Sequence, residues 1–348
     1  MDSPPVRSVD EALQRNAMTR RLHRRSLVAG QITLPAVPGM IDEYVSMCET
    51  LFAAVGRPFT AEQLGEVRAV LEGQLAEAYA HSPRSNIVIS LDAPFGTILN
   101  YHVKPEWWSV EGAYENWIST REPPLFGAEP DARVWTLANE TADPATHPVL
   151  DIGGGTGRNT LALARRGHPV DVVEMTPKFA DMIRADVDRE SLKVRVIQRD
   201  IFTTDDDLRR DYRKIVLSEV VSDFRTSQQL RALFELATSC LASGGRLVFN
   251  AFVSKPGYTP DDAVRELGQQ CYTTIFTPHE VSAAASGSPL QLISDDSVYE
   301  YEKSHLPEGT WPPTSWYADW VSGLDVFDLR REDCPIEMRW LVYQKPIW

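Results

Sequence analysis

Val149-Leu-Asp151-Ile-Gly153-Gly154-Gly155-Thr-Gly157 joins an apolar run to a segment with helical spacing. Its glycines let the backbone turn tightly and approach a ligand closely, because no Cβ atom stands in the way. A glycine-rich turn between a strand and a helix is typical of domains that bind a cofactor at the end of a parallel strand. The stretch therefore predicts an α/β domain with a ligand site at the turn.

The residues around this turn alternate short apolar runs with helical segments. Such alternation predicts βαβ units, and hence a parallel sheet with helices on both faces. The expected strands are 149–152, 170–174, 194–197, 214–218 and 246–250, and the expected helices are 159–166, 178–188 and 230–241.

A dinucleotide-binding domain is the main alternative, since its fingerprint is also rich in glycine and is followed by an acidic residue about 20 positions later. Two features disfavour it. The turn runs D-x-G-x-G-x-G instead of G-x-G-x-x-G. Asp151 also lies inside the turn, where its carboxylate would face a pyrophosphate at close range.

With these features the chain resembles the class I S-adenosylmethionine-dependent methyltransferases, whose first motif is a strand followed by D/E-x-G-x-G-x-G. The resemblance covers the segment from Val149 to Asn250, and includes the Gly244-Gly245 turn before the last of these strands. It implies an α/β, Rossmann-like sheet that is mostly parallel and seven-stranded, with an antiparallel C-terminal strand. It also implies S-adenosyl-L-methionine as the cofactor.

The resemblance places the cofactor at the ends of four strands. The turn would hold the methionine part, Glu174 would accept hydrogen bonds from the ribose hydroxyls, and Met175 would pack on the adenine. Asp200 would lie near the adenine amino group, with Ile201 supplying a backbone contact, and Ser218 would edge the active site. The implied cofactor-binding residues are Asp151, Gly153, Gly154, Gly155, Gly157, Glu174, Met175, Asp200, Ile201 and Ser218.

Three further residues are candidates for chemistry on the methyl acceptor. Tyr101 and His102 lie upstream of the cofactor domain, where this superfamily commonly carries a segment that covers the cofactor and contacts the acceptor. Glu219 follows the fourth strand, at the edge of the expected active site. A histidine or a glutamate can take a proton from an oxygen or nitrogen acceptor. For the tryptophans near Tyr101 and in the segment 311–320, packing is the alternative to acceptor binding.

The expected acceptor is a small organic molecule, methylated on oxygen or nitrogen. The fourth strand ends in Ser-Glu-Val-Val, and not in the Asn-Pro-Pro-Tyr type of string found in enzymes that methylate amino groups of DNA bases or glutamine. Three alternatives stay open: carbon methylation of an apolar alkene, methylation of a protein, and a non-catalytic role in binding S-adenosylmethionine. An alkene would need aromatic faces or a carboxylate to stabilise its developing cation.

Composition limits the partners. A net charge of -14 and a pI near 5.0 disfavour nucleic acid and anionic membranes as partners. The basic cluster at 20–25 is expected to be a solvated helix face or a segment folding over the cofactor cleft. The four cysteines form no CxxC pair, so we expect no metal site, no disulfide framework and a cytoplasmic location. A homodimer stays open.

The pattern divides the chain at about residue 130. Residues 1–130 are expected to form a helical extension or lid, with a short extended segment at 86–91. Residues 131–348 are expected to form the methyltransferase domain, with an insert at about 303–325 and with strands at 298–301 and 338–343.

Overall fold

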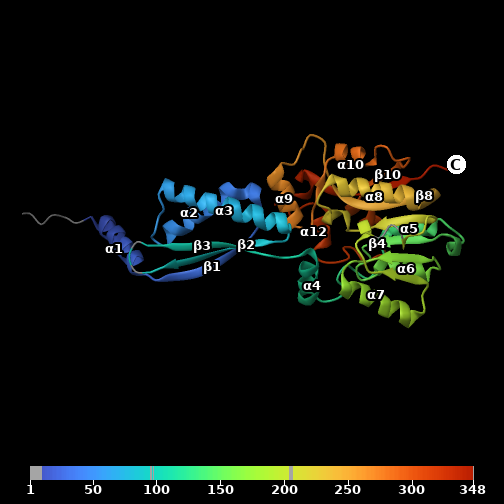
Figure 1. Ribbon diagram of the computed structural model, residues 1–348, viewed down its shortest axis with the longest axis horizontal. Helices are drawn as coiled ribbons and strands as arrows, with labels where there is room; N and C mark the ends of the chain where they lie inside the picture. The colour runs from blue at the N-terminus through green and yellow to red at the C-terminus, as the bar shows by residue number, and fades with distance from the viewer. Residues whose placement is uncertain (1–9, 95, 97, 204–206, 348) are drawn as a thin grey trace, which may run out of the picture. The chain divides into compact units, whose positions relative to one another are not determined.

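The computed structural model describes residues 10–94, 96, 98–203 and 207–347. The chain forms two compact units, Met1–Val110 and Glu111–Trp348, and Figure 1 labels helices and strands of each. The boundary lies 20 residues earlier than the sequence pattern predicts. The segment 111–130 belongs to the second unit because its aromatic side chains pack there: Trp117 stacks on Phe126 and contacts Trp316.

The first unit is an antiparallel sheet in the order β1-β2-β3 with two helices packed on it. The sequence analysis expected mostly helices here, and missed two of these three strands. The core lies between the sheet and helices α2 and α3, where Phe52, Leu71 and Ile89 are buried. The elements are α1 (Glu11–Arg25), β1 (Val28–Pro35), η1 (Pro38–Met40), α2 (Ile41–Ala54), α3 (Ala61–His81), β2 (Asn86–Ala93) and β3 (Asn100–Glu106).

The second unit alternates strands and helices, as the sequence predicts. Its helices are α4 (Val110–Thr120), α5 (Ala132–Asn139), α6 (Arg158–Arg165), α7 (Pro177–Glu190), α8 (Ser227–Cys240), α9 (Asp262–Gln270), α10 (Pro278–Ala285), α11 (Val298–His305) and α12 (Tyr317–Val321), with 3-10 turns at Pro144–Thr146, Ile201–Thr203, Val221–Asp223 and Arg331–Asp333. Its strands are β4 (Val149–Ile152), β5 (Val170–Val173), β6 (Val194–Ile197), β7 (Tyr212–Leu217), β8 (Leu241–Ser254), β9 (Ile275–Phe276), β10 (Gln291–Ser297) and β11 (Ile336–Gln344).

The central sheet has the strand order β10-β11-β8-β7-β4-β5-β6, and β9 pairs with β8 outside this path. Five neighbouring strands, β6, β5, β4, β7 and β8, are parallel to one another, whereas β11 is antiparallel to both β8 and β10. The predicted fold class, a mostly parallel Rossmann-like sheet with an antiparallel C-terminal strand, is confirmed. The order reverses at β4 and β7, which makes the ends of these strands the expected ligand site.

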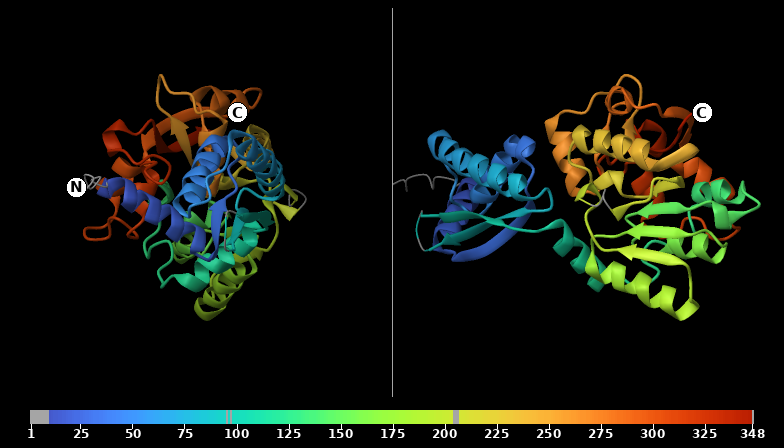
Figure 2. Two further views of the ribbon diagram at one scale, coloured as in Figure 1. Left: turned by 90° about the vertical axis from the view of Figure 1, so that its left-hand side faces the viewer. Right: turned by 45° about the vertical axis from the view of Figure 1, so that its right-hand side comes forward.

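Helices cover both faces of this sheet, as Figure 2 shows from two sides. On one face α8 and α10 bury Leu233, Phe234 and Val281 against β4, β7 and β8. On the other face α5, α6, α11 and α12 pack against the side chains that alternate with these, such as Val149 and Val216. Burial on both faces explains why β4 and β5 are apolar apart from Asp151 and Asp171, and all of their residues are buried.

Two predicted elements near the C-terminal end differ from the structure. The expected strand at 298–301 is the first turn of α11, because the Ser297 side chain accepts a hydrogen bond from the Glu300 N–H and starts a helix. Val298 and Glu302 then fall on one buried face at helical spacing. The expected insert at about 303–325 is helical only over α12, which buries Tyr317 and Trp320. The strand predicted at 338–343 is confirmed as β11.

Among the described residues, no helix is both long enough and apolar enough to cross a membrane.

Candidate cofactor and acceptor site

The glycine turn follows β4 directly and is held from below by Asp151. This carboxyl is 2% exposed, and its Oδ2 accepts a hydrogen bond from the Thr160 hydroxyl at 2.5 Å. Burial raises the pKa of Asp151 to about 7. Gly153 has a φ of +70°, and a Cβ added there would lie 2.3 Å from Cγ2 of Val220. Only glycine fits this position, because its backbone is left-handed and Val220 packs directly against it.

Glu174 follows β5, the strand next to β4. Its carboxyl group is 5% exposed and accepts hydrogen bonds from two backbone N–H groups, that of Gly155 at 2.9 Å and that of Thr176 at 2.8 Å. Burial raises the pKa of Glu174 against these hydrogen bonds. Met175 is the next residue and is half-exposed beside it. The hydrogen bond from the Gly155 N–H therefore links the Glu174 carboxyl group, just after β5, to the glycine turn that follows β4.

The remaining predicted cofactor residues follow β6 and β7. Asp200 is exposed and accepts a hydrogen bond from the Phe202 N–H at 2.9 Å, while Ile201 is buried. The Ser218 hydroxyl is buried and has no hydrogen-bond partner within the part of the chain that the structure describes. Because buried polar groups are rarely left unpaired, this hydroxyl favours a bound ligand. All the predicted positions therefore fall at the carboxyl ends of four neighbouring strands, in the glycine turn or just beyond it.

Glu219 lies one residue beyond Ser218 in a left-handed backbone conformation, with a φ of +61°. Its N–H donates to Oδ1 of Asn250 at 2.7 Å, which fixes this unusual conformation. Its carboxyl group pairs with the guanidinium of Arg158, which also pairs with Asp131 at 2.7 Å. Burial raises the pKa of Glu219 to about 7. Non-glycine residues with such backbone strain cluster at functional sites.

A third buried acid, Glu302, lies close enough to Asp131 and Arg158 to feel their charges. It accepts hydrogen bonds from the Ala132 N–H at 2.7 Å and from the Trp340 indole at 2.9 Å. Burial raises its pKa above the ordinary range. Arg158 therefore pairs with Asp131 and Glu219, and Glu302 lies near this buried pair of acids.

An aromatic cavity of about 110 Å³ opens beside Glu219. One wall, Phe126, also lies against the glycine turn: its Cε2 is 3.2 Å from the position that a Cβ of Gly155 would occupy. The ring of Phe126 stacks on Trp117 at 4.9 Å between centroids. The cavity therefore shares a wall with the turn. Its lining residues are Tyr114, Trp117, Arg121, Phe126, Glu219, Ser222, Cys271, Tyr272, Trp316, Trp320 and Asp325.

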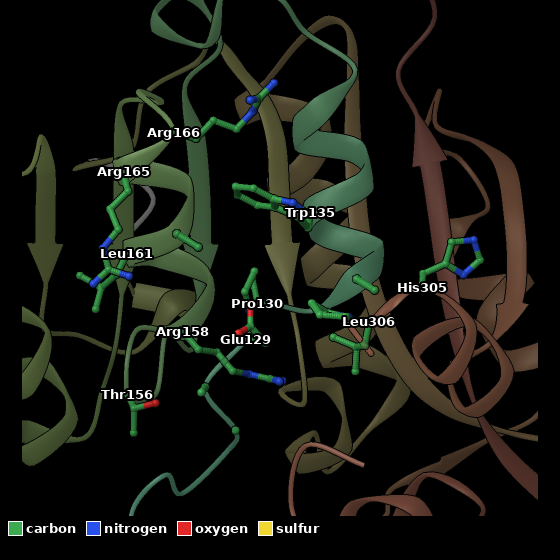
Figure 3. A pocket seen from close by; sticks show the side chains of 15 residues that line it. Glu129, Pro130, Trp135, Thr156, Arg158, Leu161, Arg165, Arg166, His305 and Leu306 are labelled. Carbon is green, nitrogen blue, oxygen red and sulfur yellow. The ribbon is translucent and has the colours of Figure 1, made fainter. Parts of the chain in front are cut away.

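A larger cavity of about 760 Å³ runs along α5 and α6 (Figure 3). Figure 3 shows Arg158, Arg165 and Arg166 along one wall and Trp135 on α5. The outer two arginines already have protein partners, since Arg165 pairs with Glu190 and Arg166 donates to backbone carbonyls. Arg158 lines this cavity and pairs with an acid of the aromatic cavity, so it lies between the two.

Residues 149–245 match the family model described as "Methyltransferase domain". This segment is less than a third of the chain, and its match supports the predicted likeness to the class I S-adenosylmethionine-dependent methyltransferases. The chain therefore carries a methyltransferase domain. None of the curated protein sequences compared with this methyltransferase matches it.

Several solved structures are similar to this methyltransferase. One is the geranyl diphosphate C-methyltransferase of Streptomyces coelicolor A3(2), with 15% identity over 62% of this chain and 75% of that chain, and a TM-score of 0.48. Another is a putative sarcosine dimethylglycine methyltransferase of Galdieria sulphuraria, with 13% identity over 68% and 98% of the two chains, and a TM-score of 0.49. A third is the StiE O-MT, residues 942–1257, with 18% identity over 61% and 72%, and a TM-score of 0.44.

Two of the three catalytic candidates lie in the first unit of the methyltransferase. Tyr101 is on β3, and its ring packs in the core of that unit, 6.1 Å from Phe52 and 6.0 Å from Phe59 between centroids. His102 is the next residue on β3 and is exposed on the opposite side of the strand. Packing accounts for Tyr101, and a role of either residue in acceptor chemistry stays a prediction.

Most of the aromatic cavity was not predicted from the sequence, apart from Trp316 and Trp320, which lie in the tryptophan-rich segment weighed there for acceptor binding. Tyr114, Trp117 and Arg121 are spaced three and four residues apart, which places them on one face of a helix and its continuation. Trp316 and Trp320 repeat the four-residue spacing in the second tryptophan-rich segment. These two spacings were a usable signal. No local pattern could have paired them with Phe126, Tyr272 or Asp325, which join the cavity only through the tertiary fold.

Proposed function

We propose that this enzyme transfers the methyl group of S-adenosylmethionine to an oxygen or nitrogen atom of a small organic acceptor bound in the aromatic cavity. The wall shared by the cavity and the glycine turn carries this proposal, because Phe126 touches Gly155 on one side and lines the cavity on the other. A group in this cavity would lie next to the site proposed for the methionine part of the cofactor.

The cofactor would be held by the residues at the four strand ends. The open backbone of the glycine turn would take the methionine part, Glu174 the ribose hydroxyls, and Met175 and Ile201 the adenine, with Asp200 near its amino group. The orphaned Ser218 hydroxyl supports this assignment. When bound, S-adenosylmethionine supplies an activated methyl group on a positively charged sulfur.

The protein itself would contribute alignment, exclusion of water and a proton acceptor. Six aromatic rings around the cavity exclude water from the acceptor. Glu219 lines the same cavity and has a pKa raised to about 7 by burial, which suits a general base near neutral pH. Arg158 fixes the orientation of this carboxyl group.

The volume of the aromatic cavity and the net charge of the protein favour a small acceptor over a macromolecule. A volume of about 110 Å³ is below the ~300–1,000 Å³ of sites for drug-sized ligands, so the cavity would hold a small acceptor or the reacting end of a larger one. The net charge of -14 disfavours nucleic acid. Carbon methylation of an alkene is the second candidate, because the aromatic walls and Glu219 could stabilise a developing cation.

The test is a turnover assay with methyl-labelled S-adenosylmethionine and separate panels of small amines, alcohols and phenols, alkenes, peptides and duplex DNA. We expect S-adenosylhomocysteine release with small oxygen or nitrogen acceptors, reduced at least about tenfold by Phe126→Ala, because the shared wall is lost. The control is Phe59→Leu, in the core of the first unit. Turnover only with alkenes, peptides or DNA would contradict the proposal.

A further inference from the structure

Helix α1, at the blue end of the chain in Figure 1, buries none of its side chains although it is 15 residues long. An isolated helix of about 15 residues is only marginally stable in water, so helices in proteins are stabilised mainly by packing one face. A cluster of exposed large apolar side chains is typical of a surface that another molecule covers. Four such side chains in and just after α1 are 63–66% exposed: Leu13, Met18, Leu22 and Leu27.

The last turn of α1 is fixed to the body of the first unit. The Arg57 side chain is buried and donates hydrogen bonds to the carbonyl oxygens of His23, at 2.6 Å, and Ser26, at 2.9 Å. These bonds satisfy carbonyl groups that the end of a helix leaves without a partner. The His23 side chain also packs directly on Gly56. The orientation of α1 on this unit is therefore defined, and the rest of its surface stays open.

The charge of α1 is opposite to that of the chain as a whole. Five arginines and one glutamate lie on α1, whereas the chain has a net charge of -14. No guanidinium of α1 makes an ion pair with any residue that the structure describes. These charges are therefore available to an acidic partner. The five arginines are Arg15, Arg20, Arg21, Arg24 and Arg25.

A complementary surface lies on the same unit, on the exposed side of α2 and α3, which we name the acidic face. These two helices carry seven acids and a single arginine, Arg68, which pairs with Asp42 and Glu72. Between the acids α3 exposes Ala69 and Val70, on which apolar side chains can pack. The other five acids are exposed and form no ion pair with any described residue: Glu43, Glu49, Glu62, Glu66 and Glu77.

From this match we infer that the protein associates with a second copy of itself, with α1 of each copy lying on the acidic face of the other. Within one copy, Arg57 fixes α1 where none of its arginines pairs with this face. Because each copy carries both surfaces, a two-fold symmetric pair makes the contact twice. At ~1.5 Å per residue α1 spans about 22 Å and α3 about 31 Å, so one helix can lie along the other.

The contact would use both properties of α1. The opposite charges would set its register on the acidic face, and its apolar side chains would be removed from water. Nucleic acid and anionic membranes are disfavoured as partners of α1, because the acidic face on the same unit would repel them.

The test is sedimentation velocity on the full chain over a range of protein concentrations. We expect a dimer with a micromolar dissociation constant at ~0.1 M salt, weakened at ~1 M salt because the Debye length falls from about 10 Å to about 3 Å. Arg21→Glu with Arg25→Glu on α1 should weaken the dimer at least about tenfold, and so should Glu62→Lys with Glu66→Lys on the acidic face. The chain that carries all four substitutions should dimerise again, because each contact regains opposite charges.

The matched control reverses two exposed arginines on a helix of the second unit, Arg184→Glu with Arg189→Glu on α7, and should leave the dimer unchanged. Circular dichroism checks that each variant keeps its helices. A monomer at every concentration, a dimer that the α1 or acidic-face variant leaves intact, or failure of the four-substitution chain to dimerise would overturn the inference. Binding of a monomeric wild type to phosphatidylserine vesicles or to duplex DNA, lost in the α1 variant, would also overturn it and would assign α1 to that partner.

Discussion

Replacing Arg158 by methionine tests whether this guanidinium supports the buried acids of the site. The side chain of Arg158 is 8% exposed, and those of its partners Asp131 and Glu219 are 1% and 9% exposed. Methionine keeps most of the apolar stem but removes the positive charge. Two carboxyl groups would then be buried without a counter-charge, which costs about 3–5 kcal/mol of the free energy of unfolding.

The matched control is Arg165→Met, on the same helix. Arg165 pairs with Glu190, but their side chains are 51% and 26% exposed. Solvent screens such a pair, so its loss should cost less than about 1 kcal/mol. Urea unfolding at pH 7.5, followed by circular dichroism, measures both variants. The difference between the two should shrink at pH 5, because burial raises the pKa of Glu219 and protonation then removes its unpaired charge in the Arg158→Met variant.

A double variant isolates the interaction. Arg158→Met with Glu219→Gln removes one of the two stranded charges, so it should recover part of the lost stability. The reasoning would be refuted if Arg158→Met cost no more than Arg165→Met at pH 7.5. It would also be refuted if the loss were the same at pH 5 and pH 7.5.

Three further predictions follow from the same geometry. Gly153→Ala should abolish cofactor binding in calorimetry, because the added Cβ would lie 2.3 Å from Val220. The control is Gly257→Ala, which has a similar positive φ but open space around it, and it should cost only about 1 kcal/mol of the free energy of unfolding and leave binding intact. Equal effects of the two substitutions on binding would contradict this prediction. Burial raises the pKa of Asp151 and Glu219 to about 7, so the folded state holds more protons than the unfolded state between the ordinary carboxyl pKa values and pH 7. The free energy of unfolding should therefore fall as the pH rises through this window. Glu219→Gln should make this fall with pH less steep, and an unchanged pH dependence would count against the raised pKa of Glu219. Tyr114→Phe removes the hydrogen bond of 2.5 Å from the Tyr114 hydroxyl to Asp223, and it should lower the free energy of unfolding by about 1–2 kcal/mol in a urea titration. An unchanged free energy of unfolding would show that this hydrogen bond does not hold α4 in place.

The sequence predicted the sheet of the second unit well because its signals are local. Each of β4 to β7 is a short, mostly apolar run, and the glycine turn follows β4 directly in the sequence. The same kind of local signal failed at 298–301, where Val298, Tyr299 and Tyr301 are residue types that favour a strand. There the capping side chain of Ser297 and the burial of Val298 and Glu302 on one face decide for a helix.

The acceptor site was less predictable because its parts are far apart in the chain. Glu219 was identified from its place after a strand. Its partner Arg158 lies at the start of α6, and the second acid that pairs with Arg158, Asp131, lies in a linker. Phe126 lies between prolines in what reads as a connecting segment, yet it forms the wall between the cavity and the glycine turn. Such contacts depend on how helices close over the sheet, which no spacing within one segment reports.

The most direct test of the account is calorimetric binding of S-adenosylmethionine and S-adenosylhomocysteine to the wild-type protein and to Glu174→Ala. Hydrogen bonds to a charged carboxylate contribute about 1.5–3 kcal/mol, so the substitution should weaken binding roughly 10- to 100-fold. Glu190→Ala, an exposed acid at the end of α7, is the control and should bind like the wild type. Micromolar binding that Glu174→Ala weakens by this factor is the predicted result. A folded wild-type protein that binds neither compound, or a Glu174→Ala variant that binds as tightly as the wild type, would contradict the cofactor site described above.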